Sequence, residues 1–125
     1  MTPLVVSVTL AAGAIGALLR FAASTLLGRP NSRLPWAVLL VNAVGSFVGG
    51  VVIGLVQSGA IGTDARLVVL SGFAGGLTTF STFSVETVQL ALSGRWRTAA
   101  ASVGLNLVIG IALAVVGFAL ATLIS

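Results

Sequence analysis

Four apolar stretches, each long enough to cross a lipid bilayer, take up almost the whole chain of 125 residues. A membrane-spanning helix needs about 20 predominantly apolar residues, and we predict such helices at 4–27, 36–56, 67–92 and 96–124. Charged residues make up only 6% of the sequence and the mean hydropathy is +1.21, whereas an ordinary soluble domain carries about 25% charged residues. The composition predicts an all-α membrane protein with a single transmembrane domain of four helices.

The scarcity of reactive side chains argues against several classes of protein. The chain has no cysteine, histidine or lysine, and its acids are limited to Asp64 and Glu86. Disulfides, thiol chemistry and histidine metal sites are therefore absent, and an enzyme is the least expected class because no pair of nucleophile and base can be assembled. The six arginines stand singly or in pairs near the ends of the apolar stretches. That placement indicates anchoring at the membrane surface, so we expect no nucleic-acid partner.

The arginines also predict an orientation in the membrane. The connection after the second span carries Arg66 beside Asp64, whereas the connections after the first and third spans carry Arg29, Arg33, Arg95 and Arg97. Positive residues favour the cytoplasmic side, which predicts both termini outside. Arg20 lies near the end of the first span, where its long side chain could reach the same interface. No basic residue precedes the first apolar run, so we expect that run to be retained as a span and not removed as a signal peptide.

Small residues recur at four-residue spacing in the second and fourth spans. They form the rows Gly45 and Gly49; Asn42, Ser46, Gly50 and Gly54; and Ser102, Asn106, Gly110 and Ala114. Such rows let helix backbones approach closely, and packing is our interpretation of the glycines. Asn42 and Asn106 are different, because an amide in hydrocarbon is costly unless it pairs or faces a polar cavity. From the residues alone, a packing hydrogen bond and a functional site are equally acceptable roles for each asparagine.

The third span contains the stretch GGLTTFSTFS at 75–84, which is a poor lipid-facing helix. A glycine pair weakens a helix, and unwound backbone at this depth is tolerated only where protein or water covers it. We predict a break between Gly75 and Thr78. A break releases carbonyls from the first half and amides from the second, and these can bind a cation and an anion respectively.

Beyond the predicted break, polar and aromatic side chains gather in one sector of the helix. Helical spacing places Phe80, Phe83, Ser84 and Thr87 on one stripe, beside Thr79, Thr82 and Glu86. Hydroxyl groups occupy five of the seven positions 78–84, more than bonding back to the helix requires, whereas two phenylalanines alone would indicate ordinary packing. Neutral donors with little fixed charge suit an ion that must be bound weakly. An anion is favoured, although the residues alone indicate only a small polar or ionic permeant.

Three motifs closely resemble those of one known family. GFAGGLTTFSTFSVE at 72–86 resembles the third-helix signature of the Fluc fluoride channels, also called the CrcB family, and GAIGALLRF and VNAVGSF match its other two motifs in the same order. The resemblance implies a fluoride-selective channel that lowers cytoplasmic fluoride by passive efflux and protects the cell from fluoride toxicity. It also implies a multi-pass protein of the bacterial cell membrane.

The resemblance implies roles for individual residues. The family forms a dual-topology dimer of two antiparallel copies, which encloses two fluoride pores. The matching pore positions in this chain are Asn42, Phe80 and Phe83, with the hydroxyl-bearing stretch Thr79, Ser81, Thr82 and Ser84. Gly75 and Thr78 match the positions whose main-chain carbonyls hold a structural sodium ion at the dimer interface. Arg20 matches the arginine of the vestibule, and Glu86 matches the acid after the phenylalanines, whose role is open.

Two departures from the family pattern concern the fourth span and the charges. Where the family commonly has an aromatic residue and serines along the pore, this chain has Ser102, Asn106 and Gly110, and Asn106 could replace a hydroxyl donor. The connections after the first and third spans together carry four arginines and the connection after the second carries one. That is a strong charge bias for a chain that inserts into the membrane in both orientations. Because the four spans show no internal repeat, inverted symmetry requires a second chain. We expect either a second copy or a sister chain of opposite bias as the partner within the lipid.

Two other functions are compatible with a protein of four short spans. A proton-coupled exporter of the small multidrug type also has four helices and dual topology, but its chemistry requires an acid in the first span, and none occurs there. A non-transporting membrane subunit is the second alternative. It predicts no fluoride flux and no fluoride sensitivity when the protein is deleted.

Overall fold

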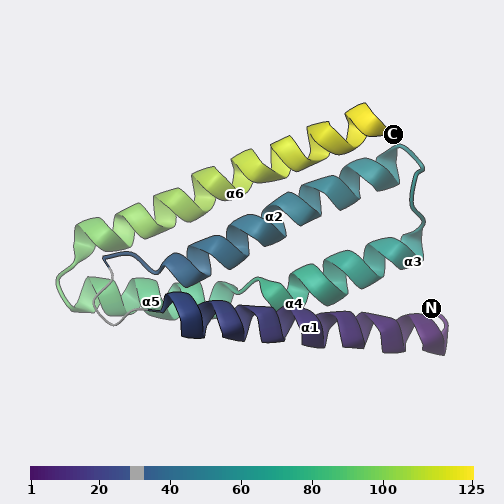
Figure 1. Cartoon of the computed structure of the whole chain (residues 1–125). Coiled ribbons are helices and arrows are strands. Elements are labelled where there is room, and N and C mark those ends of the chain that lie inside the picture. The colour runs from purple at the N-terminus through teal and green to yellow at the C-terminus, as the bar shows by residue number, and fades with distance from the viewer. Residues whose placement is uncertain (29–32) are drawn as a thin grey trace.

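A computed structural model of the chain describes residues 1–28 and 33–125, and within those ranges every regular element is helical (Figure 1). The first, second and fourth spans are the single helices α1 (Pro3–Leu27), α2 (Trp36–Gln57) and α6 (Trp96–Ile124). The third span consists of α3 (Thr63–Arg66), η1 (Leu67–Ala74), α4 (Gly75–Leu77) and α5 (Phe80–Leu92). All four stretches are long and apolar enough to cross a bilayer, so the predicted membrane fold is confirmed.

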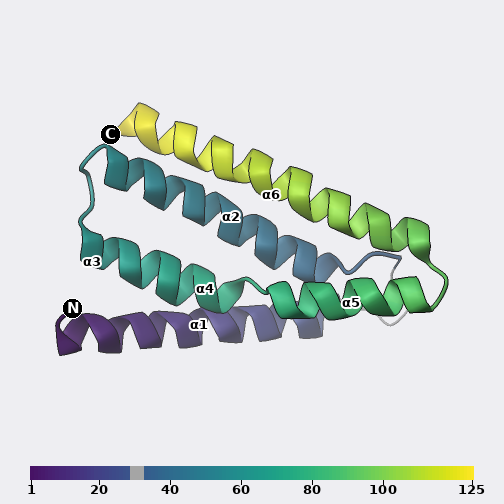
Figure 2. The same ribbon diagram turned by 180° about the vertical axis from the view of Figure 1, so that it is seen from behind.

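The spans are arranged as two pairs of long neighbours (Figures 1 and 2). α1 packs chiefly against η1 and α4, and α2 packs chiefly against α6. Both termini lie at one end of the bundle together with the connection between α2 and α3, as four crossings require. At the opposite end, Arg95 Nη2 donates a hydrogen bond to the Arg33 carbonyl at 2.8 Å, which joins two connecting segments. Arg29, part of the predicted charge bias, lies outside the described residues.

Glycines allow the backbones of α2 and α6 to approach each other closely. A Cβ atom at Gly50 would meet the Ala114 carbonyl, and one at Gly117 would meet the Phe47 carbonyl. A Cβ at Gly54 would come within 2.7 Å of the Ala121 Cβ, closer than a contact between methyl groups permits. The packing role predicted for the small residues of the second span is therefore confirmed for Gly50 and Gly54.

The third span is broken, and the break begins at Thr78, the last residue of the predicted segment. Gly75 and Gly76 are helical, and the chain becomes extended at Thr78, with ψ 158°, and at Thr79, with φ −149° and ψ 120°. Gly76 serves helix packing, because a Cβ there would meet the carbonyl of Gly13 in α1. The π-helical turns of η1 precede this contact. The break predicted between Gly75 and Thr78 is thus confirmed at its last residue, while Gly75 and Gly76 stay helical, and close packing on α1 is the physical reason for Gly76.

Candidate functional site

The extended backbone at the break is bound from the side by an asparagine of α2. Asn42 Oδ1 accepts a hydrogen bond from the Thr79 amide at 2.9 Å, and Asn42 Nδ2 donates to the Thr79 carbonyl at 3.3 Å. Thr79 itself is only 6% exposed, so both backbone groups would otherwise be costly at this depth. Asn42 therefore supplies the hydrogen bonds that make an interrupted helix tolerable here.

A second asparagine extends this interaction to α6. Asn42 Nδ2 also donates to Asn106 Oδ1 at 3.2 Å, and Asn106 Nδ2 donates to the Ser102 carbonyl at 2.9 Å. The alternatives left open for the asparagines are thereby resolved in part, because Asn42 and Asn106 do form a packing hydrogen bond. The same bond brings residues of the second, third and fourth spans together at the break.

The threonine at the break also begins the second half of the span. The Thr79 hydroxyl accepts a hydrogen bond from the Thr82 amide at 3.1 Å, which caps the first turn of α5. It also donates to the Thr82 hydroxyl at 3.2 Å and lies 3.3 Å from the Ser81 hydroxyl. Three of the predicted hydroxyl residues thus form one cluster at the amino end of α5.

Other hydroxyls of the third span bond back to their own helix. Ser84 donates to the Phe80 carbonyl and Thr87 to the Phe83 carbonyl, each at 2.8 Å. Thr78 likewise donates to the Ala74 carbonyl at 2.8 Å. These are ordinary i to i−4 bonds, so the excess of hydroxyls expected from the sequence is smaller than the count of serines and threonines indicates.

An open groove of about 470 Å³ lies beside the break. Its lining combines polar and aromatic side chains with aliphatic ones: Asn42, Ser46, Thr78, Thr79, Phe80, Phe83, Val103, Asn106 and Leu107. The centroids of the Phe80 and Phe83 rings lie 6.1 Å apart with 44° between the ring planes, and Phe80 is 81% exposed. Ser46 was not among the predicted site residues. Its position one turn beyond Asn42 on the same face of α2 was the signal that could have identified it.

Arg20 reaches the break and not the end of its helix. Its Nη1 atom donates a hydrogen bond to the Thr78 carbonyl at 3.2 Å, and its side chain is half-buried between α1 and the third span. The expectation that this side chain extends to the membrane interface was therefore wrong. The Thr78 carbonyl has lost its helical donor, because the Thr82 amide bonds to the Thr79 hydroxyl instead. It therefore accepts a charge-assisted hydrogen bond from the Arg20 guanidinium.

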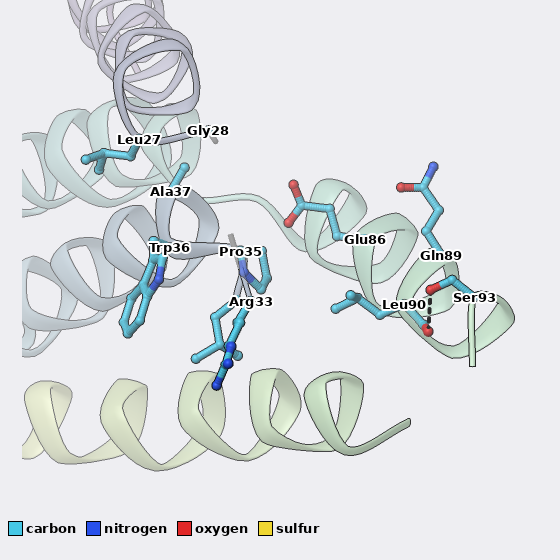
Figure 3. Close-up of a pocket in the computed structure, with 11 residues that line it drawn as sticks. Leu27, Gly28, Arg33, Pro35, Trp36, Ala37, Glu86, Gln89, Leu90 and Ser93 are labelled. Atoms are coloured by element: carbon cyan, nitrogen blue, oxygen red, sulfur yellow. Dashed lines mark hydrogen bonds between the residues drawn. The ribbon is translucent and has the colours of Figure 1, made fainter. Parts of the chain in front are cut away.

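Glu86 lies apart from the groove and lines a second cavity of about 270 Å³ at the end of the bundle opposite the termini (Figure 3). The cavity is also lined by Arg33, Trp36, Gln89 and Ser93. Figure 3 shows the Glu86 carboxylate pointing away from the Arg33 guanidinium, and within the described residues its Oε2 atom has no hydrogen-bond partner. The structure therefore does not bring Glu86 to the phenylalanine pair.

Of the two carbonyls predicted to hold a sodium ion, that of Gly75 lies before the break and that of Thr78 lies within it. In a continuous helix the Thr79 amide would donate to the Gly75 carbonyl, but it donates to Asn42 instead, so the Gly75 carbonyl is released. Gly75 is exposed. The Thr78 carbonyl accepts from Arg20 and retains a second lone pair. Hard, neutral oxygen atoms suit an alkali cation, and no group of three or more acidic side chains exists in the described part of the chain to hold a different metal.

Four spans with a broken third helix and a groove of neutral donors at the break define a membrane protein of the channel or transporter class. The family described as CrcB-like protein, Camphor Resistance (CrcB), matches residues 7–118. The chain therefore belongs to the CrcB family, as its motifs predict.

Several curated relatives are similar over most of their length. A protein of Syntrophotalea carbinolica is 41% identical over 114 residues, covering 87% of this chain and 90% of the relative. One from Aeromonas salmonicida is 39% identical over 112 residues, covering 88% and 90%. One from Thermus thermophilus is 39% identical over 109 residues, covering 86% and 87%. All three are named fluoride-specific ion channel FluC.

Proposed function

We propose that the chain is a fluoride-selective channel that lowers cytoplasmic fluoride by passive efflux. The observation that carries this proposal is the groove at the break, which combines two amide side chains, hydroxyls and two aromatic rings without an acid, in a chain whose relatives are named for fluoride. An anion is stabilised there by neutral donors and by the positive edges of the rings.

The driving force for efflux requires no chemical energy source. Hydrogen fluoride crosses membranes as a neutral weak acid and dissociates in a near-neutral cytoplasm, which traps the anion. The membrane potential then favours anion exit by about 2.3 kcal/mol per 100 mV. A pathway of weak sites is enough to release the trapped ion and so to protect the cell.

Individual side chains have distinct parts in this proposal. Phe80 and Phe83 present ring edges to the moving ion, and Asn42 and Asn106 offer amide donors. Thr79 lines the groove, where its hydroxyl replaces water around the ion, and the resemblance implies the same part for Ser81, Thr82 and Ser84 further along α5. Arg20 is half-buried at the break and contributes a positive charge, which attracts anions toward it.

We further infer that two chains in opposite orientation build the complete pathway. Phe80 is 81% exposed on the groove, and Gly75 is exposed beside the break, so both are accessible to a second protomer. Converging Gly75 and Thr78 carbonyls from the two protomers would hold a structural sodium ion, which would fix the two broken helices against each other. The partner is either a second copy or a sister chain.

Fluoride efflux from proteoliposomes, followed with a fluoride electrode, tests the channel proposal. We expect rapid efflux that depends on the protein and is little affected by excess chloride. A non-transporting subunit predicts efflux no faster than from empty vesicles, and that result would reject the channel.

Fusions at the carboxy terminus test the opposite orientation of the two chains. A reporter that is active only in the cytoplasm and one that is active only outside should both give signal from the chain expressed alone. An exclusively external signal would exclude dual insertion. It would favour a sister chain of opposite charge bias as the partner.

A further inference from the structure

We propose that Asn106 determines selectivity between anions. Its amide oxygen accepts a hydrogen bond from the Asn42 amide nitrogen, and an anion that binds to this donor must displace that oxygen. The inference rests on the fluoride conduction proposed above and assigns a specificity-determining residue to that pathway.

The orientation of both amides is dictated by the backbone groups that they contact. An N–H group only donates and a carbonyl only accepts, so the Thr79 amide requires Oδ1 of Asn42 on its side. In the same way the Ser102 carbonyl requires Nδ2 of Asn106. The remaining contact is then necessarily from Asn42 Nδ2 to Asn106 Oδ1, at 3.2 Å.

This contact is the place where an anion can reach the Asn42 amide donor without disturbing the backbone. An amide nitrogen carries two protons, and those of Asn42 Nδ2 are held by the Thr79 carbonyl and by Asn106 Oδ1. Of these acceptors, the first belongs to the main chain at the break and the second to a side chain in the wall of the groove. An anion in the groove therefore obtains the donor by displacing Asn106 Oδ1.

Displacement of an amide oxygen discriminates between halides. Fluoride is the smallest halide, concentrates its charge most strongly and is the strongest hydrogen-bond acceptor among them. It can replace a neutral oxygen on an N–H group with a net gain. Chloride is larger and a weaker acceptor, so a greater part of its binding is lost in breaking the bond between the asparagines. The internal competitor also keeps fluoride binding weak enough for release, as conduction requires.

The test replaces Asn106 with leucine, which has a similar size but no acceptor. Asn42 then presents a donor without a competitor, and we expect the permeability ratio of fluoride to chloride to fall roughly tenfold, chiefly through faster chloride passage. The ratio is measured from fluoride and chloride efflux under identical conditions. Thr122→Leu in the same helix is the matched control, because the Thr122 hydroxyl bonds to the Phe118 and Ala119 carbonyls of its own helix and lies outside the groove.

Hydrogen exchange at the Thr79 amide separates this role from a structural one. Asn42 keeps both of its bonds to Thr79 in Asn106→Leu, so protection of that amide should match the wild type, whereas Asn42→Leu should remove it. Faster exchange in Asn106→Leu would mean that Asn106 merely positions Asn42 and would overturn the inference. An unchanged selectivity ratio would overturn it as well. A wild-type chain that carries no fluoride would reject the channel itself, and that result is visible before any variant is made.

Discussion

Asn42 pairs with both backbone groups of Thr79, which lies 37 positions further along the chain, through an amide oxygen at 2.9 Å and an amide nitrogen at 3.3 Å. A side chain of the second span thereby replaces helical bonds that the third span does not make. The break is consequently a fixed structural element, because its backbone groups have defined partners in a medium that offers no water.

Asn42→Asp should nearly abolish fluoride efflux while the protein still assembles. A carboxylate can accept from the Thr79 amide, but it cannot donate to the Thr79 carbonyl or to Asn106, and it adds a negative charge to the groove. Repulsion of about 4 kcal/mol between unit charges at contact distance predicts a loss of more than 100-fold. The electrode assay measures the flux and size-exclusion chromatography the assembly. Gln57→Glu, the same change at the exposed end of α2, should conduct normally.

Phe80→Ile should reduce fluoride efflux by about fivefold, since an aromatic edge contributes on the order of 1 kcal/mol beyond its area. Phe80 is 81% exposed in the protomer, so the monomer fold should not change. Leu92→Ile is the control, because Leu92 is 83% exposed on the same helix and lies outside the groove. Equal efflux from both variants would remove Phe80 from the pathway.

Gly76→Ala should destabilise the fold, whereas Gly104→Ala should not. A Cβ at Gly76 meets the Gly13 backbone, while one at Gly104 meets no atom within 4 Å. Forcing α1 and the third span apart is expected to cost about 1–3 kcal/mol. The midpoint of thermal unfolding in detergent measures the difference. If the two midpoints shift equally, the glycine pair is not a packing contact.

Removal of sodium should lower fluoride efflux if the Gly75 and Thr78 carbonyls hold the ion. Without a cation the released carbonyls repel one another and the two protomers lose a fixed contact. Purification and reconstitution in choline salts should give weak efflux, and returned sodium should restore it. Full activity after prolonged dialysis against choline would exclude a sodium requirement.

The four spans follow from composition because the thickness of the bilayer alone fixes how many apolar residues each needs. The break was predicted between Gly75 and Thr78, and it begins at the last of these residues. A glycine pair weakens a helix and also permits close helix contact, and only the position of Gly13 on the neighbouring helix decides which effect applies here. The polar and aromatic character of the groove was also predictable only in part, because the sequence of the third span shows its hydroxyls and rings at helical spacing but not what lies opposite them.

The partners of the break could not be predicted from the residues. Asn106 lies 64 positions after Asn42, and Arg20 lies 58 positions before Thr78, so no local pattern relates them. Arg20 also had an acceptable place at the interface, and the released carbonyl was the competing acceptor that sequence spacing did not reveal. The roles of the Ser84 and Thr87 hydroxyls were ambiguous for a related reason. A serine or threonine hydroxyl in a helix donates to a carbonyl of its own helix unless another acceptor is closer.

The pairing of α1 with the third span and of α2 with α6 has a consequence for how the protein is made. The main partner of α1 is the third span and that of α2 is α6, each two spans later in the chain, so neither helix finds its main partner in the span that follows it. The first pair can close only after residue 77 has been synthesised, and the second only near the carboxy terminus. α2 must therefore persist in the lipid without its main partner until α6 has been synthesised, and a chain truncated within α6 would leave α2 without its glycine-lined partner.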